Sequence, residues 1–185
     1  MKEKIWKAGR KMRPIVLTGF MGSGKSTLGR RLARRMHLPF FDMDAVIEQR
    51  EGCSVSQLFA RRGEETFRQL ETALLKEMLQ QSDCVIATGG GTMLRKENRS
   101  AALQQGIVVF LKAGEETVYE RVSRNNRRPL AQGKSKEELA ELYRSRLPYY
   151  EECHICLEEG KKNPEQCAAW LEEQIRRRQR EWITA

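Results

Sequence analysis

Residues 19–26 constrain the fold of this chain more than any other segment. They read Gly-Phe-Met-Gly-Ser-Gly-Lys-Ser and match the pattern G-x-x-x-x-G-K-[ST] in full. The short apolar run 15–18 precedes them, and apolar residues recur at helical spacing through residues 25–36. A glycine-rich turn between a strand and a helix points backbone N–H groups at phosphates, and the helix N-terminus adds a partial positive charge. The sequence therefore predicts a nucleoside triphosphate site.

Within this loop, Lys25 is expected to reach the β- and γ-phosphates, and Ser26 is expected to bind Mg²⁺. The loop does not identify the phosphate acceptor, because GTPases, motor ATPases and small kinases all use it. A chain of 185 residues leaves little room beyond a nucleotide-binding core, which favours a compact kinase of small molecules. The loop residues expected to contact ATP are Gly22, Ser23, Gly24, Lys25, Ser26 and Thr27.

Strand and helix patterns alternate along the rest of the chain. Short apolar runs predict five strands, at residues 15–18, 39–42, 84–88, 107–112 and 154–157. Helices are predicted at residues 25–36, 44–50, 54–62, 64–81, 95–105, 115–124 and 135–146, the last ended by Pro148, with one more helix at the C-terminus. Such alternation predicts an α/β fold of three layers, in which a five-stranded parallel sheet is flanked by helices, as in P-loop NTPases.

Length and composition indicate one domain at residues 14–185. Residues 1–13 read as a basic N-terminal extension, and Met12 is a possible alternative start. Apolar runs are far shorter than the roughly 20 residues of a membrane helix, and no apolar segment follows the basic start as in a secretory signal. We therefore expect no membrane association and a cytoplasmic, monomeric protein.

Five cysteines and a net charge of +9 bear on ligands and partners. An odd cysteine count without an export signal predicts free thiols, and we interpret Cys153 and Cys156 as small buried residues of a strand, not as a metal or redox site. The arginines fall largely in helical segments, without interleaved aromatic residues. The charge therefore favours anionic small molecules over nucleic acid.

Two carboxylates, Asp42 and Asp44, lie at the predicted C-terminal end of the second strand. Open α/β sheets bind ligands at this edge. Carboxylates there can hold Mg²⁺ through water, accept hydrogen bonds from substrate hydroxyls, or take the proton of an attacking hydroxyl. The alternative is that one of them only caps the following helix.

Arg68 and Glu71 share one face of a predicted helix, so Glu71 could hold the guanidinium while its fork binds a substrate carboxylate. Taken alone, this spacing also fits an ordinary surface ion pair. Residues 89–91 are three glycines at the end of the third strand, where many P-loop proteins carry a Mg²⁺-binding Asp. Glycines there allow a ligand to approach the backbone, although a tight turn would also use them.

Taken together, the motifs resemble those of the shikimate kinase family, in order, over residues 15–164. They are the phosphate loop, D-M-D at 42–44, F-R-x-x-E at 67–71, G-G-G at 89–91, R-R-P-L at 127–130 and R-L-P-Y-Y at 146–150. The resemblance implies that Asp42 holds Mg²⁺ through water and that Asp44 binds the shikimate hydroxyls and is the candidate base. It also implies that the shikimate site contains Asp44, Arg68, Gly89, Gly90, Gly91 and Arg146.

The resemblance further implies a lid at about residues 125–134 that carries Arg128, which contacts ATP and substrate. Arg121 and the loop at residues 161–164 would lie near the adenine. The implied reaction converts ATP and shikimate to ADP and shikimate 3-phosphate, a step of aromatic amino acid biosynthesis, with Lys25, Asp44 and Arg128 as the catalytic residues. The alternatives are a gluconate-type kinase and a nucleotide-binding homologue without catalytic activity.

Overall fold

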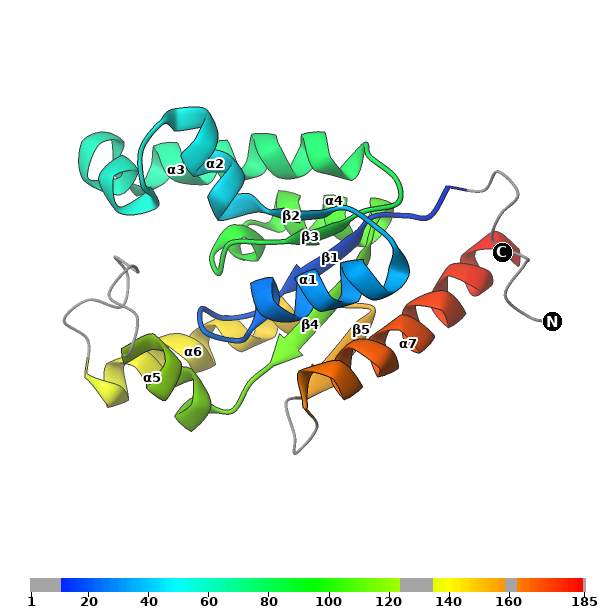
Figure 1. Cartoon of the computed structure of the whole chain (residues 1–185). Coiled ribbons are helices and arrows are strands. Elements are labelled where there is room, and N and C mark those ends of the chain that lie inside the picture. The colour runs from blue at the N-terminus through cyan, green and yellow to red at the C-terminus, as the bar shows by residue number, and fades with distance from the viewer. Residues whose placement is uncertain (1–10, 124–134, 159–162, 185) are drawn as a thin grey trace.

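Five parallel strands form a single sheet with the order β2-β3-β1-β4-β5 (Figure 1). The structure is a computed structural model that describes residues 11–123, 135–158 and 163–184. The central strand pairs Ile15 with Val85 on one side and with Ile107 on the other. The strands are β1 (Ile15–Thr18), β2 (Phe40–Asp42), β3 (Val85–Ala87), β4 (Ile107–Lys112) and β5 (Ile155–Glu158). The predicted α/β fold with a five-stranded parallel sheet is confirmed.

Helices cover both faces of this sheet and complete the three layers (Figure 1). They are α1 (Lys25–Met36), α2 (Met43–Glu51), α3 (Val55–Leu79), α4 (Lys96–Gln105), α5 (Glu115–Ser123), α6 (Lys136–Glu151) and α7 (Pro164–Thr184), with the short 3₁₀ helix η2 at Thr92–Leu94. Side chains alternate along β1, so Ile15 and Leu17 pack with α1 and α7, whereas Val16 packs with the helices of the opposite face. Both faces are therefore apolar, as a buried parallel sheet requires.

A break at Gly63 divides α3 into the two segments that the sequence predicts. Gly63 has φ 78° and ψ 167°, a left-handed backbone that interrupts the helix. The first segment begins at a capping box, in which the Ser54 hydroxyl accepts from the backbone N–H of Gln57. The second segment buries Phe67, Leu74, Leu75 and Met78 against the sheet. These side chains form the core-facing side of the segment.

The prediction that Pro148 ends α6 is wrong. The helix continues through Pro148 to Glu151, although a proline inside a helix removes one backbone hydrogen bond. Tyr150 explains the continuation, because its side chain is fully buried with its ring 5.5 Å from that of Phe110. The Tyr150 hydroxyl also donates to the backbone oxygen of Gly90. Tertiary packing thus holds the last turn of the helix in place.

The prediction of two buried thiols at the fifth strand is also wrong. Cys156 lies in β5 and is exposed, and Cys153 is half-buried just before this strand. A strand at the edge of a sheet keeps one of its faces accessible, and the burial along β5 alternates accordingly. Both thiols are free.

Met12, within the predicted N-terminal extension, contacts the body of the protein. Its side chain is buried, and its backbone N–H donates to the Asp83 carboxylate over 2.8 Å. Residues 1–10 of that extension and the predicted lid with Arg128 lie outside the described residues. Within the described part of the chain, none of the helices combines the length and the apolar character that crossing a membrane requires.

Truncation of Leu171 to alanine tests the packing of α7 on α1. Leu171 is fully buried between these helices and the sheet, so Leu171→Ala should lower the free energy of unfolding by about 2–5 kcal/mol. Ile183→Ala, in the last turn of α7, should change it by less than about 0.5 kcal/mol because Ile183 is exposed. Guanidinium denaturation followed by circular dichroism measures both, and equal losses would contradict the placement of α7.

Candidate active site

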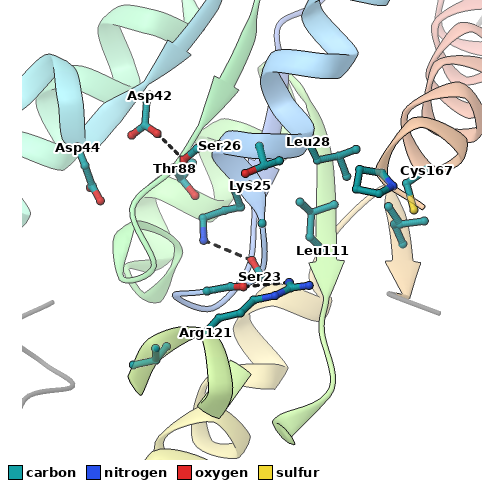
Figure 2. Close-up of a pocket in the computed structure, with 16 residues that line it drawn as sticks. Ser23, Lys25, Ser26, Leu28, Asp42, Asp44, Thr88, Leu111, Arg121 and Cys167 are labelled. Carbon is teal, nitrogen blue, oxygen red and sulfur yellow. Dashed lines mark hydrogen bonds between the residues drawn. The ribbon is translucent and has the colours of Figure 1, made fainter. Parts of the chain in front are cut away.

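A cavity of about 650 Å³ lies at the C-terminal edge of the sheet, where the loops that follow the strands begin (Figure 2). Every loop residue predicted to contact ATP lines it, from Gly22 to Thr27. Asp42, Asp44 and Arg121 line it too. Figure 2 shows the two carboxylates on one side of the cavity and Leu28, Leu111 and Cys167 on the other. The cavity is therefore polar and acidic at one end and apolar at the other.

The phosphate loop wraps around the amino group of Lys25. Lys25 is buried, and its Nζ donates to the backbone oxygens of Gly19 and Phe20 over 2.7 and 2.9 Å. Gly24 precedes α1 with φ 85°, a left-handed conformation that glycine adopts without steric cost. The N-terminus of α1, whose first N–H groups have no partner within the helix, thus faces the cavity. The amino group of Lys25 can thus exchange its contacts with the loop carbonyls for contacts with phosphate oxygens.

Ser26 and Asp42 place two oxygen ligands side by side in this cavity. The Ser26 hydroxyl donates to the Asp42 carboxylate over 2.5 Å (Figure 2). Asp42 occupies the N-cap position of α2, but its side chain makes no capping hydrogen bond. The alternative that Asp42 acts only as a helix cap is therefore not supported. A hydroxyl and a carboxylate are the hard oxygen ligands that suit Mg²⁺.

Arg121 lies across the opening of the phosphate loop. Its Nη1 donates to the backbone oxygen of Gly22 over 3.2 Å, and it projects from α5 into the cavity (Figure 2). The apolar end beyond it is formed by Leu28, Leu111, Leu157 and Cys167 with Pro164 at the start of α7. A flat aromatic ring fits such an apolar end, beside a cation and next to the phosphate loop. Pro164 belongs to the loop at residues 161–164 that the resemblance places near the adenine, of which 161 and 162 lie outside the described residues. Sequence reasoning missed the other four side chains because they come from four separate elements.

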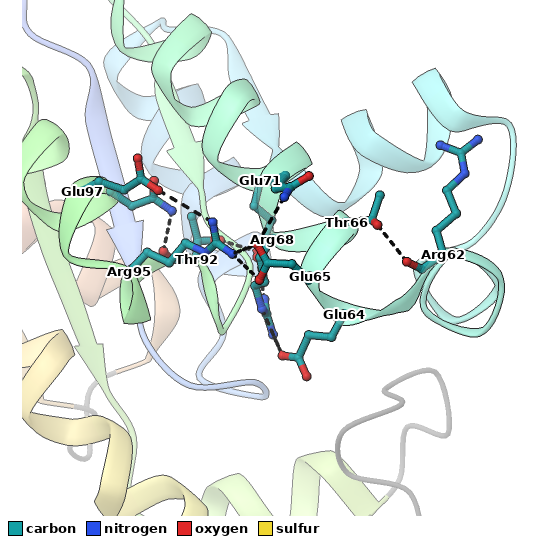
Figure 3. Close-up of polar contacts among 11 residues, drawn as sticks. Arg62, Glu64, Glu65, Thr66, Arg68, Glu71, Thr92, Arg95 and Glu97 are labelled. Carbon is teal, nitrogen blue, oxygen red and sulfur yellow. Dashed lines mark hydrogen bonds and ion pairs between the residues drawn. The ribbon is translucent and has the colours of Figure 1, made fainter.

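Arg68 and Glu71 form a buried ion pair, so the surface-pair alternative is wrong. The exposed fractions of their side chains are 11% and 1%, and Nη1 of Arg68 donates to Glu71 over 2.5 Å (Figure 3). Burial raises the pKa of Glu71 above its ordinary value, whereas the Arg68 charge and a hydrogen bond from Thr92 lower it. The Thr92 hydroxyl donates to the second oxygen of Glu71 over 2.5 Å. Glu71 is therefore fixed from two sides.

Two of the three glycines, Gly89 and Gly91, make room for charged side chains. A Cβ atom on Gly91 would lie 2.3 Å from Nη1 of Arg68. A Cβ atom on Gly89 would lie 2.3 Å from a Glu71 oxygen and 2.9 Å from an Asp44 oxygen. A Cβ atom at either position would force these side chains to move, and Arg68 and Glu71 are buried and held by hydrogen bonds, so glycine suits both positions. Gly89 thus lies between Asp44, at the edge of the cavity, and the Arg68 and Glu71 pair.

Arg146 is a second buried arginine near this pair. It is 7% exposed, its guanidinium lies 5.6 Å from the centre of the Phe20 ring, and its Nη1 has no hydrogen-bond partner among the described residues. Burial raises the pKa of Tyr150 to about 12, and the charges of Arg146 and, less strongly, Arg68 oppose this rise. Both guanidinium groups are therefore close to one hydroxyl. A buried, unpaired N–H of a cation indicates a site for an anion.

The structure brings together most of the residues that the sequence singles out. Gly89 adjoins the cavity through Asp44, whereas the glycines 89–91, Arg68 and Arg146 do not themselves line it. Sequence reasoning missed Thr92 and Tyr150. A hydroxyl directly after the triple glycine was the available signal for Thr92, but the sequence does not show that Glu71 is its partner.

Comparison with known proteins agrees with this geometry. The model of the shikimate kinase family matches residues 21–176. A shikimate kinase from Thermodesulfovibrio yellowstonii is 38% identical over 158 residues, which are 85% of this chain and 91% of that protein.

Two solved structures are informative. The shikimate kinase from Acinetobacter baumannii, in complex with shikimate, has a TM-score of 0.85 and 35% identity, and the match covers 89% of this chain and 93% of that one. A gluconokinase from Sinorhizobium meliloti has a TM-score of 0.59 at 16% identity, over 95% and 98% of the two chains, and is similar in fold alone. By family match, identity and coverage, this chain belongs to the shikimate kinase family.

Proposed function

We propose that this protein transfers the γ-phosphoryl group of ATP to the 3-hydroxyl of shikimate, giving ADP and shikimate 3-phosphate. The observation that carries the proposal is the pair of buried arginines, Arg68 and Arg146, beside a phosphate loop in a member of this family. A small carboxylate fits between two buried guanidinium groups, of which one has an N–H without a partner in the described structure. Gluconate also carries a carboxylate, and family membership selects shikimate over it.

On the nucleotide side, the phosphate loop and Lys25 bind the phosphates of ATP. Lys25 would leave the backbone oxygens of Gly19 and Phe20 for the β- and γ-phosphates. Ser26 and Asp42 would hold Mg²⁺, the latter through water, and Mg²⁺ supplies charge neutralisation at the phosphate oxygens. Arg121 and the apolar end of the cavity would receive the adenine.

On the acceptor side, Arg68 and Arg146 orient shikimate by its carboxylate, and the backbone at residues 89–91 borders the ring. Asp44 then accepts the proton of the 3-hydroxyl as its oxygen attacks the γ-phosphorus and the bond to ADP breaks. Phosphoryl transfer needs positioning and charge neutralisation from the protein, and both are available here. We further propose residues 14–185 as one domain that acts as a monomer in the cytoplasm, with Arg128 of the lid at 125–134 completing the charge around the γ-phosphate.

Release of ADP from Mg·ATP by the purified protein tests this function. Shikimate should stimulate it strongly, whereas gluconate, a nucleoside monophosphate and buffer alone should not. Asp44→Asn should lower kcat by about 10²–10⁴-fold, because the base is lost, and should leave nucleotide binding intact. Stimulation by another acceptor alone would overturn the shikimate assignment, and unchanged kcat in Asp44→Asn would overturn the role of Asp44.

Substitution of the two arginines of α6 distinguishes the carboxylate site from the helix surface. Arg146→Lys should raise the KM for shikimate by about 10- to 100-fold, because lysine cannot make the bidentate contact of a guanidinium. Arg144→Lys is the matched control two residues earlier, where the side chain is 61% exposed and pairs with Glu115. It should leave all kinetic constants unchanged. Equal effects of the two substitutions would contradict the proposed role of Arg146.

The pH dependence of shikimate binding tests how Thr92 positions Glu71. Loss of the hydroxyl in Thr92→Val removes an influence that lowers the pKa of Glu71, so Glu71 should become protonated at higher pH. A neutral Glu71 no longer holds Arg68 by charge, so the KM for shikimate should rise as the pH falls. In Thr92→Val this rise should begin at a higher pH than in the wild type. Thr92→Ser keeps the hydroxyl and should restore the wild-type profile, whereas identical profiles for all three proteins would refute the role of Thr92.

A further inference from the structure

Glu64 occupies one edge of the Arg68 guanidinium. A single oxygen of Glu64 accepts from both Nε and Nη2 of Arg68, over 3.1 and 2.8 Å (Figure 3). The same edge, with its two parallel N–H groups, is one on which arginine can bind both oxygens of a carboxylate ligand. Glu71 takes Nη1, which belongs to the other edge. Both edges of Arg68 are thus engaged by the protein's own carboxylates.

The two carboxylates differ in how firmly they are held. Glu71 is 1% exposed and accepts a second hydrogen bond from Thr92, so its release would leave a charge buried without a partner. The side chain of Glu64 is 51% exposed, and an ion pair with one exposed member contributes little to stability. A carboxylate that enters this site can therefore replace Glu64 and cannot replace Glu71.

The backbone allows Glu64 to move away. Glu64 directly follows the break in α3 at Gly63, where the space beside the backbone is open and a Cβ atom would meet no described neighbour within 4 Å. It is also the first residue of the second segment of α3, where the N-terminal N–H groups of a helix favour a negative charge. Once it leaves Arg68, Glu64 can keep a hydrated and electrostatically suitable place.

We propose that Glu64 holds the place of the acceptor's carboxylate on the Nε and Nη2 edge of Arg68 and is displaced when the acceptor binds. This inference rests on the proposed function, in which Arg68 binds that carboxylate. Glu64 then sets acceptor affinity, because the acceptor must compete with a tethered anion for the same two N–H groups. It keeps the Arg68 cation paired when no acceptor is bound, at the expense of acceptor affinity.

Steady-state kinetics of Glu64→Gln test the proposal, with Glu65→Gln as the matched control. Glu65 is the next residue, but its carboxylate pairs with Arg95 on the surface. Glu64→Gln should lower the KM for shikimate by about two- to fivefold, the range expected for loss of a weak competing ion pair, with kcat and the KM for ATP unchanged. Glu65→Gln should match the wild type.

Calorimetric titration of shikimate without nucleotide provides a second readout, in which Kd should fall by a similar factor in Glu64→Gln and in Glu64→Ala. An increased KM and Kd would show that Glu64 instead orients Arg68 for the acceptor, and unchanged values would show that it does not compete; either result overturns the proposal. Failure of the proposed function itself is recognised separately, because the wild type would then show no shikimate-dependent release of ADP.

Discussion

The parallel direction of all five strands is the constraint on which the site depends. It places the C-terminal ends of β1, β2 and β3 next to one another at one edge of the sheet. The phosphate loop, the Asp42 to Asp44 segment and the triple glycine follow these three strands directly. Segments far apart in the sequence therefore meet at this edge. An antiparallel pairing would send one of them to the opposite edge.

Burial of Glu71 determines much of the acceptor side. A carboxylate without solvent needs a positive partner and further hydrogen bonds, which Arg68 and Thr92 provide. The two large charged side chains fit against the following loop only because positions 89 and 91 carry no Cβ. The pair, the hydroxyl and the glycines thus form one interdependent unit. Its contacts leave the Arg68 side chain little freedom to turn, and recognition of a planar carboxylate requires such restriction.

The sequence predicts the features that depend on neighbours along the chain, and fails where distant contacts decide. The phosphate loop, the alternation of strands and helices, and the break at residue 63 all have local signals. Pro148 reads locally as a helix end, but the buried ring of Tyr150 keeps the turn helical. The spacing of Arg68 and Glu71 is the same in a surface pair and in a buried one, so only the packing of α3 separates the two interpretations. For Thr92, the hydroxyl after the triple glycine is visible in the sequence, but its partner Glu71 is set by the fold.

The cations of the candidate site differ in how their N–H groups are satisfied. Lys25 donates to carbonyls of its own loop, and Arg68 donates to a half-exposed glutamate, whereas Nη1 of Arg146 lacks a partner in the described part of the chain. If Lys25 and Arg68 bind ligand oxygens as proposed, they exchange internal partners for them, so part of the gross binding energy replaces existing contacts. The internal contacts keep these cations from being buried without a partner, which would destabilise the protein. Arg146 has no such contact to give up at Nη1, so in the proposed site its interaction with an anion contributes most fully to binding.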